Sequence, residues 1–366
     1  MHLKSLRLIN FRNYPEETIT FDPSFTAILG SNGAGKTNIL EGLHYLCLTR
    51  GYSALSDAQN IRNGETFFTL IGTTGHDTRS DEVRLSYSPE GKQLSKNGKE
   101  IRRFADHIGT LPVVMVAPQD IALVWEAGEP RRRFFDQWMS QADRNYLQDL
   151  LLYNGHLKQC NVLLRQVREG MPADRDLIML YHQRMAPAAA RIATYRTRFL
   201  EKVGPVVSDF YREVSGGRES VALGLSTGSE STDFEAIWRQ SMERDMAAGR
   251  ITEGPHRDEY LFLMEGHEVR KFGSQGQQKS FLVALKLAAH AVISTAAGFP
   301  PLLLLDDIFE KMDDERTRNL LRLAGAGGFG QVILTDSSPD RALARLAEAG
   351  ISHATRMIEN GRVVAA

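Results

Sequence analysis

The stretch Gly30-Ser31-Asn32-Gly33-Ala34-Gly35-Lys36-Thr37 fits the pattern GxxxxGK[ST] of a phosphate-binding loop. Residues 25–29 before it have the apolar character of a strand, and residues 37–48 after it have the pattern of an amphipathic helix. In such a loop the glycines let backbone N–H groups wrap the phosphates, Lys36 reaches the β and γ phosphates, and Thr37 ligates Mg²⁺. The stretch therefore predicts a P-loop nucleotide-binding protein of the α/β class.

A second element lies towards the C-terminal end, where the apolar run at 302–305 follows two prolines and ends in Asp306 and Asp307. An apolar strand ending in a carboxylate suits Mg²⁺ opposite the phosphate loop, because open α/β sheets bind ligands at that edge. The interval from Thr37 to this strand is far longer than in small GTPases or nucleoside kinases, and no NKxD guanine-reading sequence occurs. These observations favour an ATPase with an inserted arm and with ATP and Mg²⁺ as cofactors.

A third element is Gly273-Ser274-Gln275-Gly276-Gln277, which precedes a helix expected over 278–297. A serine hydroxyl and glycine amides at a helix N-terminus form an anion site, although in isolation a polar helix cap explains them as well. Their place shortly before the acid-ended strand matches the signature helix of ABC ATPases. In those proteins this helix completes the nucleotide site of the opposite copy, so ATP binding and dimerisation are linked.

The middle of the chain has a helical period and separates the two ATPase segments. Two apolar seams alternate spacings of three and four on either side of a turn at 169–175: Leu150, Tyr153, Leu157, Cys160, Leu164 and Val167, then Tyr181, Met185, Ala188, Ile192, Tyr195 and Phe199. They predict an antiparallel helix pair, either in a compact bundle or as a short projecting coiled coil. Residues 215–233 are rich in Gly, Ser and Thr and predict a loop. The expected division is 1–118, 119–249 and 250–366, with the first and last segments forming the ATPase lobe.

The charge and cysteine content limit where the protein works. The formal net charge of -1 gives no protein-wide basic field, so contact with nucleic acid requires local patches. Cys47 and Cys160 both lie in apolar helical patterns, which suits a reducing cytoplasm. The N-terminus has no apolar signal region and no run approaches 18 apolar residues, so export and membrane spanning are not expected.

Taken together, these motifs resemble the RecF family of recombination and replication-repair ATPases, which is related to SMC proteins. The matching stretches are Leu8 to Tyr14, Gly30 to Glu41, Pro112 to Met115, Arg131 to Asp136, Gly254-Pro255-His256-Arg257-Asp258 and Ser274 to Lys279, together with the strand that ends at Asp307. The resemblance implies an ABC/SMC-type head whose inserted helical lobe carries a short antiparallel coiled-coil arm. It also implies an ATP-dependent dimer on gapped or junction DNA, which works with a RecR-type mediator in recombinase loading, replication restart and the SOS response.

The resemblance also assigns roles to residues. Arg12 is the expected phosphate contact, Asn13 and Asn38 lie beside the nucleotide, and Ser274, Gly276 and Gln277 meet the γ-phosphate in trans. Lys36, Asp306 and Asp307 are the expected catalytic residues, with Thr37 and Asp306 at Mg²⁺. Asp307 stands where many ABC proteins have a glutamate one methylene longer, which predicts slow, DNA-stimulated hydrolysis. Gln119 takes the place of a glutamine that senses magnesium and water.

Two stretches depart from common patterns. Residues 310–313 read Glu-Lys-Met-Asp where the family usually has SELD, and Asp336 occupies the place of the sensor histidine of ABC transporters. Both departures concern how the γ-phosphate is sensed.

For DNA, the strongest candidate is the run Arg131, Arg132 and Arg133, because positive charge near a helix N-terminus opposes the helix macrodipole and favours an anion. Pairing with neighbouring acids at Asp136, Glu126 and Glu129 is an equally good explanation. No set of residues is suited to reading base edges, so DNA binding is expected to favour structure over sequence.

Two other classes of protein share the phosphate loop. The ATPase subunit of a transporter is disfavoured by Asp336 and by the GPHRD stretch. A P-loop kinase acting on a small acceptor is disfavoured by the signature helix.

Overall fold

The computed structural model describes residues 2–53, 55–76, 79–217, 219–228, 231–308 and 314–364. The chain forms two compact units. The first unit comprises Met1–Ile121, Phe210–Arg218 and Gln275–Ala366, and the second comprises Ala122–Asp209 and Glu219–Ser274. This differs from the predicted division at 249/250: Phe210–Arg218 belongs to the first unit, and residues 259–264 pair with a strand of the second unit, which extends to Ser274.

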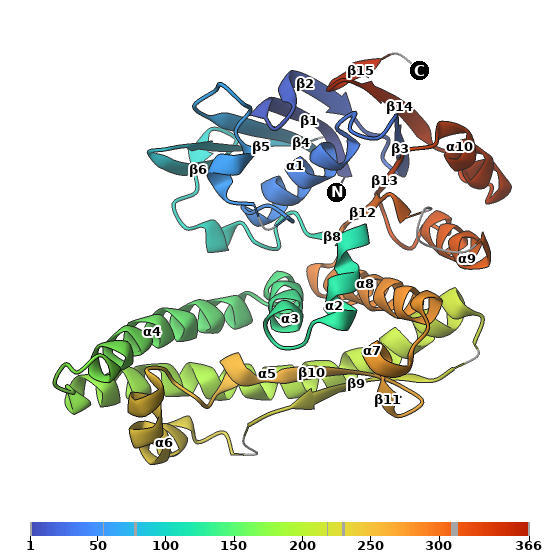
Figure 1. Cartoon of the computed structure of the whole chain (residues 1–366). Helices are drawn as coiled ribbons and strands as arrows, with labels where there is room; N and C mark the ends of the chain where they lie inside the picture. The colour runs from blue at the N-terminus through green and yellow to red at the C-terminus, as the bar shows by residue number, and fades with distance from the viewer. Residues whose placement is uncertain are drawn as a thin grey trace. The chain divides into compact units, whose positions relative to one another are not determined.

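The first unit contains two six-stranded sheets (Figure 1). The antiparallel sheet has the order β2-β1-β4-β5-β6-β7. Its strands are β1 (His2–Phe11), β2 (Tyr14–Thr20), β4 (Phe68–His76), β5 (Arg79–Ser88), β6 (Gly91–Lys96) and β7 (Lys99–Glu100). The other sheet has the order β15-β14-β3-β13-β12-β8 and is parallel except for β15. Its strands are β3 (Phe25–Leu29), β8 (Val113–Val116), β12 (Leu302–Asp306), β13 (Val332–Asp336), β14 (Ala354–Glu359) and β15 (Arg362–Val364).

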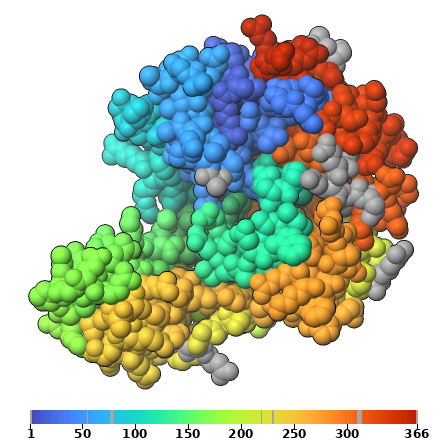
Figure 2. Space-filling model, in the orientation of Figure 1, coloured from blue at the N-terminus to red at the C-terminus, as the bar shows by residue number. Residues whose placement is uncertain are grey.

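Helix α1 (Lys36–Leu48) joins the two sheets. Its Ile39, Leu40, Leu43 and Leu46 are fully buried and share one core with Leu6 and Leu8 of β1 and with apolar residues of β8 and β12. The first unit also contains α8 (Gln275–Ala297), α9 (Asp314–Gly325) and α10 (Pro339–Glu348), with the short turns η1 (Asp57–Asn60), η2 (Phe104–Asp106) and η3 (Pro118–Ile121). In Figure 2 the N-terminal part, in blue, and the C-terminal part, in red, form one packed body. The core thus fixes the loop before α1 to the parallel sheet.

Helix α8 is the one helix, among the residues that the structure describes, that is long and apolar enough to cross a membrane by length and composition. Of its most apolar window, 67% is buried inside the protein, and this helix packs against β8 and η3. Its apolar character is therefore used in the core of the first unit.

The second unit is mainly helical. It contains α2 (Ala122–Trp125), α3 (Glu129–Ala142), α4 (Arg144–Arg168), most of α5 (Arg175–Ser215), α6 (Phe234–Ala248), η4 (Pro255–Arg257) and α7 (Val269–Phe272). A three-stranded sheet of order β11-β10-β9 completes it, with β9 (Val221–Ser226), β10 (Glu259–Met264) and β11 (His267–Glu268). The prediction of a loop over 215–233 is wrong for residues 221–226, which form β9.

Helices α4 and α5 form the predicted antiparallel pair. Asp149 binds Arg191 and His156 stacks near Tyr181, so the partner numbers fall along α5 as they rise along α4. The pair has an addition that the sequence did not predict, because α6 packs on α4 and its buried Trp238 lies between Tyr153 and His182. The helical lobe is therefore more compact than a two-helix arm.

Candidate nucleotide-binding site

The phosphate loop follows β3 and leads directly into α1. Gly35 has a φ of 114°, and a Cβ there would lie 2.5 Å from Asn13 Nδ2, so no larger residue fits without displacement. Ser31 and Asn32 are exposed, whereas Lys36 is buried and its Nζ donates a hydrogen bond to the Ser31 carbonyl at 2.9 Å. This arrangement holds the lysine against the inner side of the loop, as phosphate binding requires.

The parallel sheet brings the loop and the acidic strand to one edge. Strand β13 lies between β3 and β12, with Asp336 paired to Leu29 and Thr335 paired to Asp306 in register. Gly30 and Asp306 therefore leave the sheet at the same C-terminal edge, where open α/β sheets bind ligands.

Asp306 and Thr37 meet at this edge. The Thr37 hydroxyl donates to Asp306 Oδ1 at 3.0 Å, and the Thr335 hydroxyl donates to the same oxygen at 2.7 Å. Burial raises the pKa of Asp306 to about 6, the negative charge of Asp307 adds to this, and the hydroxyl donors and Lys36 oppose it. An adjacent hydroxyl and carboxylate fit Mg²⁺, which takes few protein ligands beside the phosphates of its nucleotide.

Asp307 follows in an unusual backbone conformation, with a φ of 43°. Its N–H donates to the Thr335 carbonyl at 3.2 Å, which fixes the backbone at this point. A positive φ is uncommon for a residue other than glycine and often occurs where function sets the backbone.

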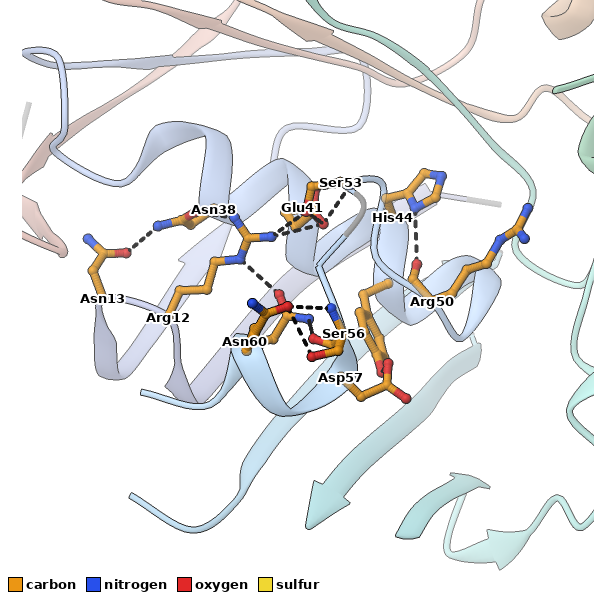
Figure 3. A network of polar contacts seen from close by, with 12 residues as sticks. Arg12, Asn13, Asn38, Glu41, His44, Arg50, Ser53, Ser56, Asp57 and Asn60 are labelled. Atoms are coloured by element: carbon orange, nitrogen blue, oxygen red, sulfur yellow. Dashed lines mark hydrogen bonds and ion pairs between the residues drawn. The ribbon is translucent and has the colours of Figure 1, made fainter. Parts of the chain in front are cut away.

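Arg12 forms a cluster beside α1 (Figure 3). Its guanidinium donates to Asn38 Oδ1 at 3.0 Å, to Asn60 Oδ1 at 2.9 Å and to the Ser53 hydroxyl at 2.8 Å, and it pairs with the buried Glu41 at 3.0 Å. The side chain keeps 16% of its surface exposed. Arg12 is therefore fixed next to the phosphate loop, with part of its surface open.

Asn13 connects this cluster to the phosphate loop. Its Nδ2 donates to the Ala34 carbonyl at 3.2 Å, and its Oδ1 accepts from Asn38 Nδ2 at 2.8 Å. The neighbouring Tyr14 hydroxyl donates to the Gly35 carbonyl at 3.1 Å. The predicted nucleotide contacts at 12, 13 and 38 thus form one hydrogen-bonded group with the loop.

The signature residues lie at the start of α8. Ser274 is exposed, and Gly276 and Gln277 are half-buried in the first turn. A Cβ at Gly276 would lie 2.1 Å from Nη1 of Arg316 on α9, so the guanidinium lies directly against the first turn of α8. The helix N-terminus therefore presents its backbone amides beside a guanidinium, a combination that attracts anions.

The chain is similar to known proteins both in sequence and in fold. The model of the AAA domain family matches residues 5–119. A DNA replication and repair protein RecF from Cytophaga hutchinsonii is 35% identical over 93% of this chain and 90% of that protein. Another from Porphyromonas gingivalis is 36% identical over 99% of this chain and 100% of that protein.

The chain belongs to the RecF family. A solved structure described as the recombination mediator protein RecF-ATP in the RecFOR pathway has a TM-score of 0.87 and 26% identity, covering 99% of this chain and 97% of that one. The Smc head domain of Pyrococcus furiosus shares the fold, with a TM-score of 0.56 and 17% identity over 99% of this chain and 96% of that one. The predicted family and fold class are confirmed, and the transporter and kinase alternatives fall away.

Asp336 has a defined place in this RecF-family site. It is fully buried at the end of β13, where it accepts from the Ser338 N–H at 2.7 Å and pairs with Arg341 at 2.9 Å. Arg341 was not predicted, although its position five residues after an acid at a strand end is a usable signal. The predicted departure at residues 310–313 lies outside the described residues.

Gln119 is exposed in η3, directly after β8. Its neighbour Asp120 is buried, and Asp120 Oδ2 accepts the Ala117 N–H at 2.8 Å. The buried acid fixes the backbone at this point and leaves the glutamine side chain exposed.

The arginine run at 131–133 divides by position. Arg131 is buried, donates to the carbonyls of Leu123, Val124 and Tyr260, and lies 4.0 Å from the Phe262 ring centre. This corrects the expectation that Arg131 binds DNA, because its guanidinium is used inside the second unit. Arg132 is half-buried and donates to the Asp258 carbonyl at 2.9 Å, whereas Arg133 is exposed and pairs with Glu129.

The GPHRD stretch closes a second buried cluster. Arg196 of α5 pairs with Asp258 and with Asp136, each at 2.7 Å, and donates to the Tyr146 hydroxyl at 3.1 Å. His256 Nδ1 and the Tyr153 hydroxyl form a hydrogen bond of 2.6 Å. Arg196 was not predicted, because it lies next to the apolar seam of α5, where exposed arginines are also common.

Proposed function

We propose that this protein is a DNA-repair ATPase in which ATP acts mainly as a switch for dimerisation on DNA. The observation that carries the proposal is the meeting of the phosphate loop with the Thr37–Asp306 pair at one edge of the parallel sheet. Full-length membership of the RecF family supports the assignment to DNA replication and repair.

Within one copy, the loop amides and Lys36 would hold the β and γ phosphates, and Arg12, Asn13 and Asn38 would frame the nucleotide. Bound Mg²⁺ would be held by Thr37 and Asp306 and would neutralise phosphate charge. Asp307 would orient the attacking water. Because its side chain is shorter than glutamate, we propose that hydrolysis is slow and ends the switch rather than driving rapid turnover.

The second half of the site would come from another copy of the chain. Ser274 is exposed and the first amides of α8 are near Arg316, so this end of the helix suits the γ-phosphate of a partner. ATP binding would then stabilise the dimer, because nucleotide binds the closed dimer more tightly than the single copy.

On DNA, we propose that the dimer binds gapped or single/double-strand junctions without base readout, and assists recombinase loading, replication restart and the SOS response with a RecR-type mediator in the cytoplasm. Of the arginine run, Arg133 is the exposed candidate for a phosphate contact.

The test is the mass of the protein in solution, measured by light scattering with and without ATP and Mg²⁺, in the presence and absence of a gapped duplex. Wild type is expected to become a DNA-retaining dimer with ATP, and Lys36→Arg is expected to stay monomeric. Mass and DNA retention that ignore nucleotide in the wild type would refute the switch.

A further inference from the structure

Three polar side chains meet in the first unit, outside the nucleotide contacts described above: Lys286 and Asp120 are buried, and Tyr52 is half-buried. Lys286 of α8 donates to the Tyr52 hydroxyl at 2.8 Å and pairs with Asp120 at 3.1 Å. The Tyr52 hydroxyl also donates to Asp120, so each of the three contacts the other two. The cluster joins α8, the loop after α1 and the turn that carries Gln119.

This cluster is costly to bury. Burial lowers the pKa of Lys286, although Asp120 opposes this, and burial raises the pKa of Tyr52. A buried ion pair adds little stability compared with apolar side chains of similar volume, whereas breaking it leaves an unpaired charge. The cluster therefore holds α8 in one position relative to the loop that carries Tyr52 and the turn η3 that carries Asp120.

The loop after α1 also reaches the Arg12 cluster. Ser53, next to Tyr52 in the chain, accepts from Arg12 Nη2 at 2.8 Å, and its hydroxyl and N–H donate to Glu41 at 2.8 and 3.0 Å. Figure 3 shows Ser53 and Glu41 facing the Arg12 guanidinium. Adjacent residues of one short loop therefore contact two buried ion pairs, one beside the phosphate loop and one on α8.

The contacts form a continuous path inside the first unit. From the Ala34 carbonyl the path passes through Asn13 and Asn38 to Arg12. It continues through the Ser53–Tyr52 peptide to Asp120 and Lys286. Lys286 lies eleven positions after Gln275, the first residue of α8, which is about 16 Å along a helix.

We infer that Tyr52, Asp120 and Lys286 are positioning residues that couple the phosphate loop of one copy to the signature end of α8 in the same copy. Under the proposed function, on which this inference rests for its biological meaning, that end of α8 serves the partner's nucleotide. Occupancy of one site would then set the geometry of the other, which gives the two sites of a dimer a coupling free energy.

The experiment separates the coupling from dimerisation. In a Ser274→Arg background, which blocks closure with a partner, amide hydrogen exchange is measured with and without a non-hydrolysable ATP analogue and Mg²⁺. The analogue is expected to slow exchange both in the phosphate loop and in the first turns of α8. Adding Tyr52→Phe, or separately Lys286→Met, should keep the effect at the phosphate loop and reduce the effect at α8 by about fivefold or more.

His290→Leu is the matched control, because His290 is a buried polar residue one turn further along α8 whose ring nitrogen contacts the Pro301 carbonyl at 2.9 Å. It removes a buried hydrogen bond from the same helix without touching the path, so the response at α8 should persist. The inference is overturned if α8 does not respond to the analogue, if both path variants respond like the parent, or if His290→Leu loses the response equally.

Failure of the proposed function gives a different result. Wild type would then keep the same mass with and without ATP, while the exchange response at α8 and its loss in Tyr52→Phe would still be seen.

Discussion

Each unit of the molecule holds an arginine in a cluster of polar contacts, and the two arginines differ in burial and in partners. Arg196 in the second unit has 2% of its side chain exposed and pairs with two carboxylates, Asp136 and Asp258. Arg12 in the first unit has 16% exposed, pairs with one carboxylate and also binds neutral amides beside the phosphate loop. The Arg196 cluster is closed on itself, whereas the Arg12 cluster lies beside the phosphate loop with part of its surface exposed.

The same difference separates the sequence motifs that the two clusters contain. The stretch at 8–14 contacts the phosphate loop, because Asn13 donates a hydrogen bond to the Ala34 carbonyl. The stretches at 131–136 and 254–258 contact each other. Arg132 donates to the Asp258 carbonyl, and Asp136 and Asp258 both pair with Arg196. One motif thus contacts the phosphate loop in the first unit, and the other two build a closed ion-pair cluster in the second.

The largest expected effect tests the closed cluster. Arg196→Met leaves the buried Asp258 and the half-buried Asp136 without their partner and should lower the free energy of unfolding by about 3–5 kcal/mol. Trp125, Trp138 and Trp238 are all the tryptophans of the chain and all lie in the second unit, so their fluorescence in urea reports this unfolding. The exposed Arg198→Met on the same helix is the control and should change little. A loss below about 1 kcal/mol for Arg196→Met would contradict the account.

The arginine run gives the next comparison. Arg131→Met removes three hydrogen bonds to main-chain carbonyls and a cation–π contact, and should cost about 2–4 kcal/mol of stability. Arg133→Met, its exposed neighbour, should cost less than about 1 kcal/mol, because surface ion pairs contribute little. Urea denaturation of both variants measures these costs. Equal losses of unfolding free energy would contradict the distinction between the buried Arg131 and the exposed Arg133.

The site in the first unit should depend on pH through Asp306. Its carboxylate must be ionised to hold Mg²⁺, and its pKa is raised to about 6, so the affinity for ATP with Mg²⁺ should fall about tenfold between pH 7 and pH 5. In the protein without nucleotide, the stability of the fold changes with pH in the opposite direction from the affinity. The contribution of Asp306 to the free energy of unfolding is present below about pH 4 and is lost as the pH rises through 6. Calorimetric titration should show the affinity change, and Asp306→Asn should remove its slope. An unchanged slope in that variant would assign the titration to another group.

The last prediction concerns the stability of the second unit at acid pH, where the change is gradual. Burial lowers the pKa of His256 to about 4, so its stability contribution is present above about pH 6.5 and is lost as the pH falls towards 4, at up to about 1 kcal/mol per pH unit. His256→Gln should flatten the acid slope of tryptophan-detected unfolding. The same slope in wild type and variant would exclude His256 as its source.

The fold and the core of the site could be predicted because their signals are local. The phosphate loop and the strand ending at Asp306 each carry their chemistry in a few adjacent residues, and parallel pairing brings them to one edge. The helix pair α4 and α5 was visible in its apolar period. Strand β9 was hidden, because its single Gly224 and its Gly- and Ser-rich surroundings look like a loop.

The buried charges could not be predicted in the same way. Arg131, Arg196 and Lys286 are residue types that are usually exposed, and their partners lie far away in the sequence. Only Lys286 left a signal, as the single lysine in the mainly apolar stretch 281–297 of α8. Pairing across the fold, rather than the local pattern, decides where such side chains lie.

The most direct test of the central claim mixes two inactive variants. Lys36→Ala lacks a working phosphate loop and Ser274→Arg lacks a working signature end, so each alone should remain monomeric by light scattering with ATP and Mg²⁺. A 1:1 mixture can build one complete site from the loop of one copy and the helix of the other, and the account predicts ATP-dependent heterodimers. A mixture that stays monomeric, while wild type dimerises with ATP, would contradict a nucleotide site shared between two copies.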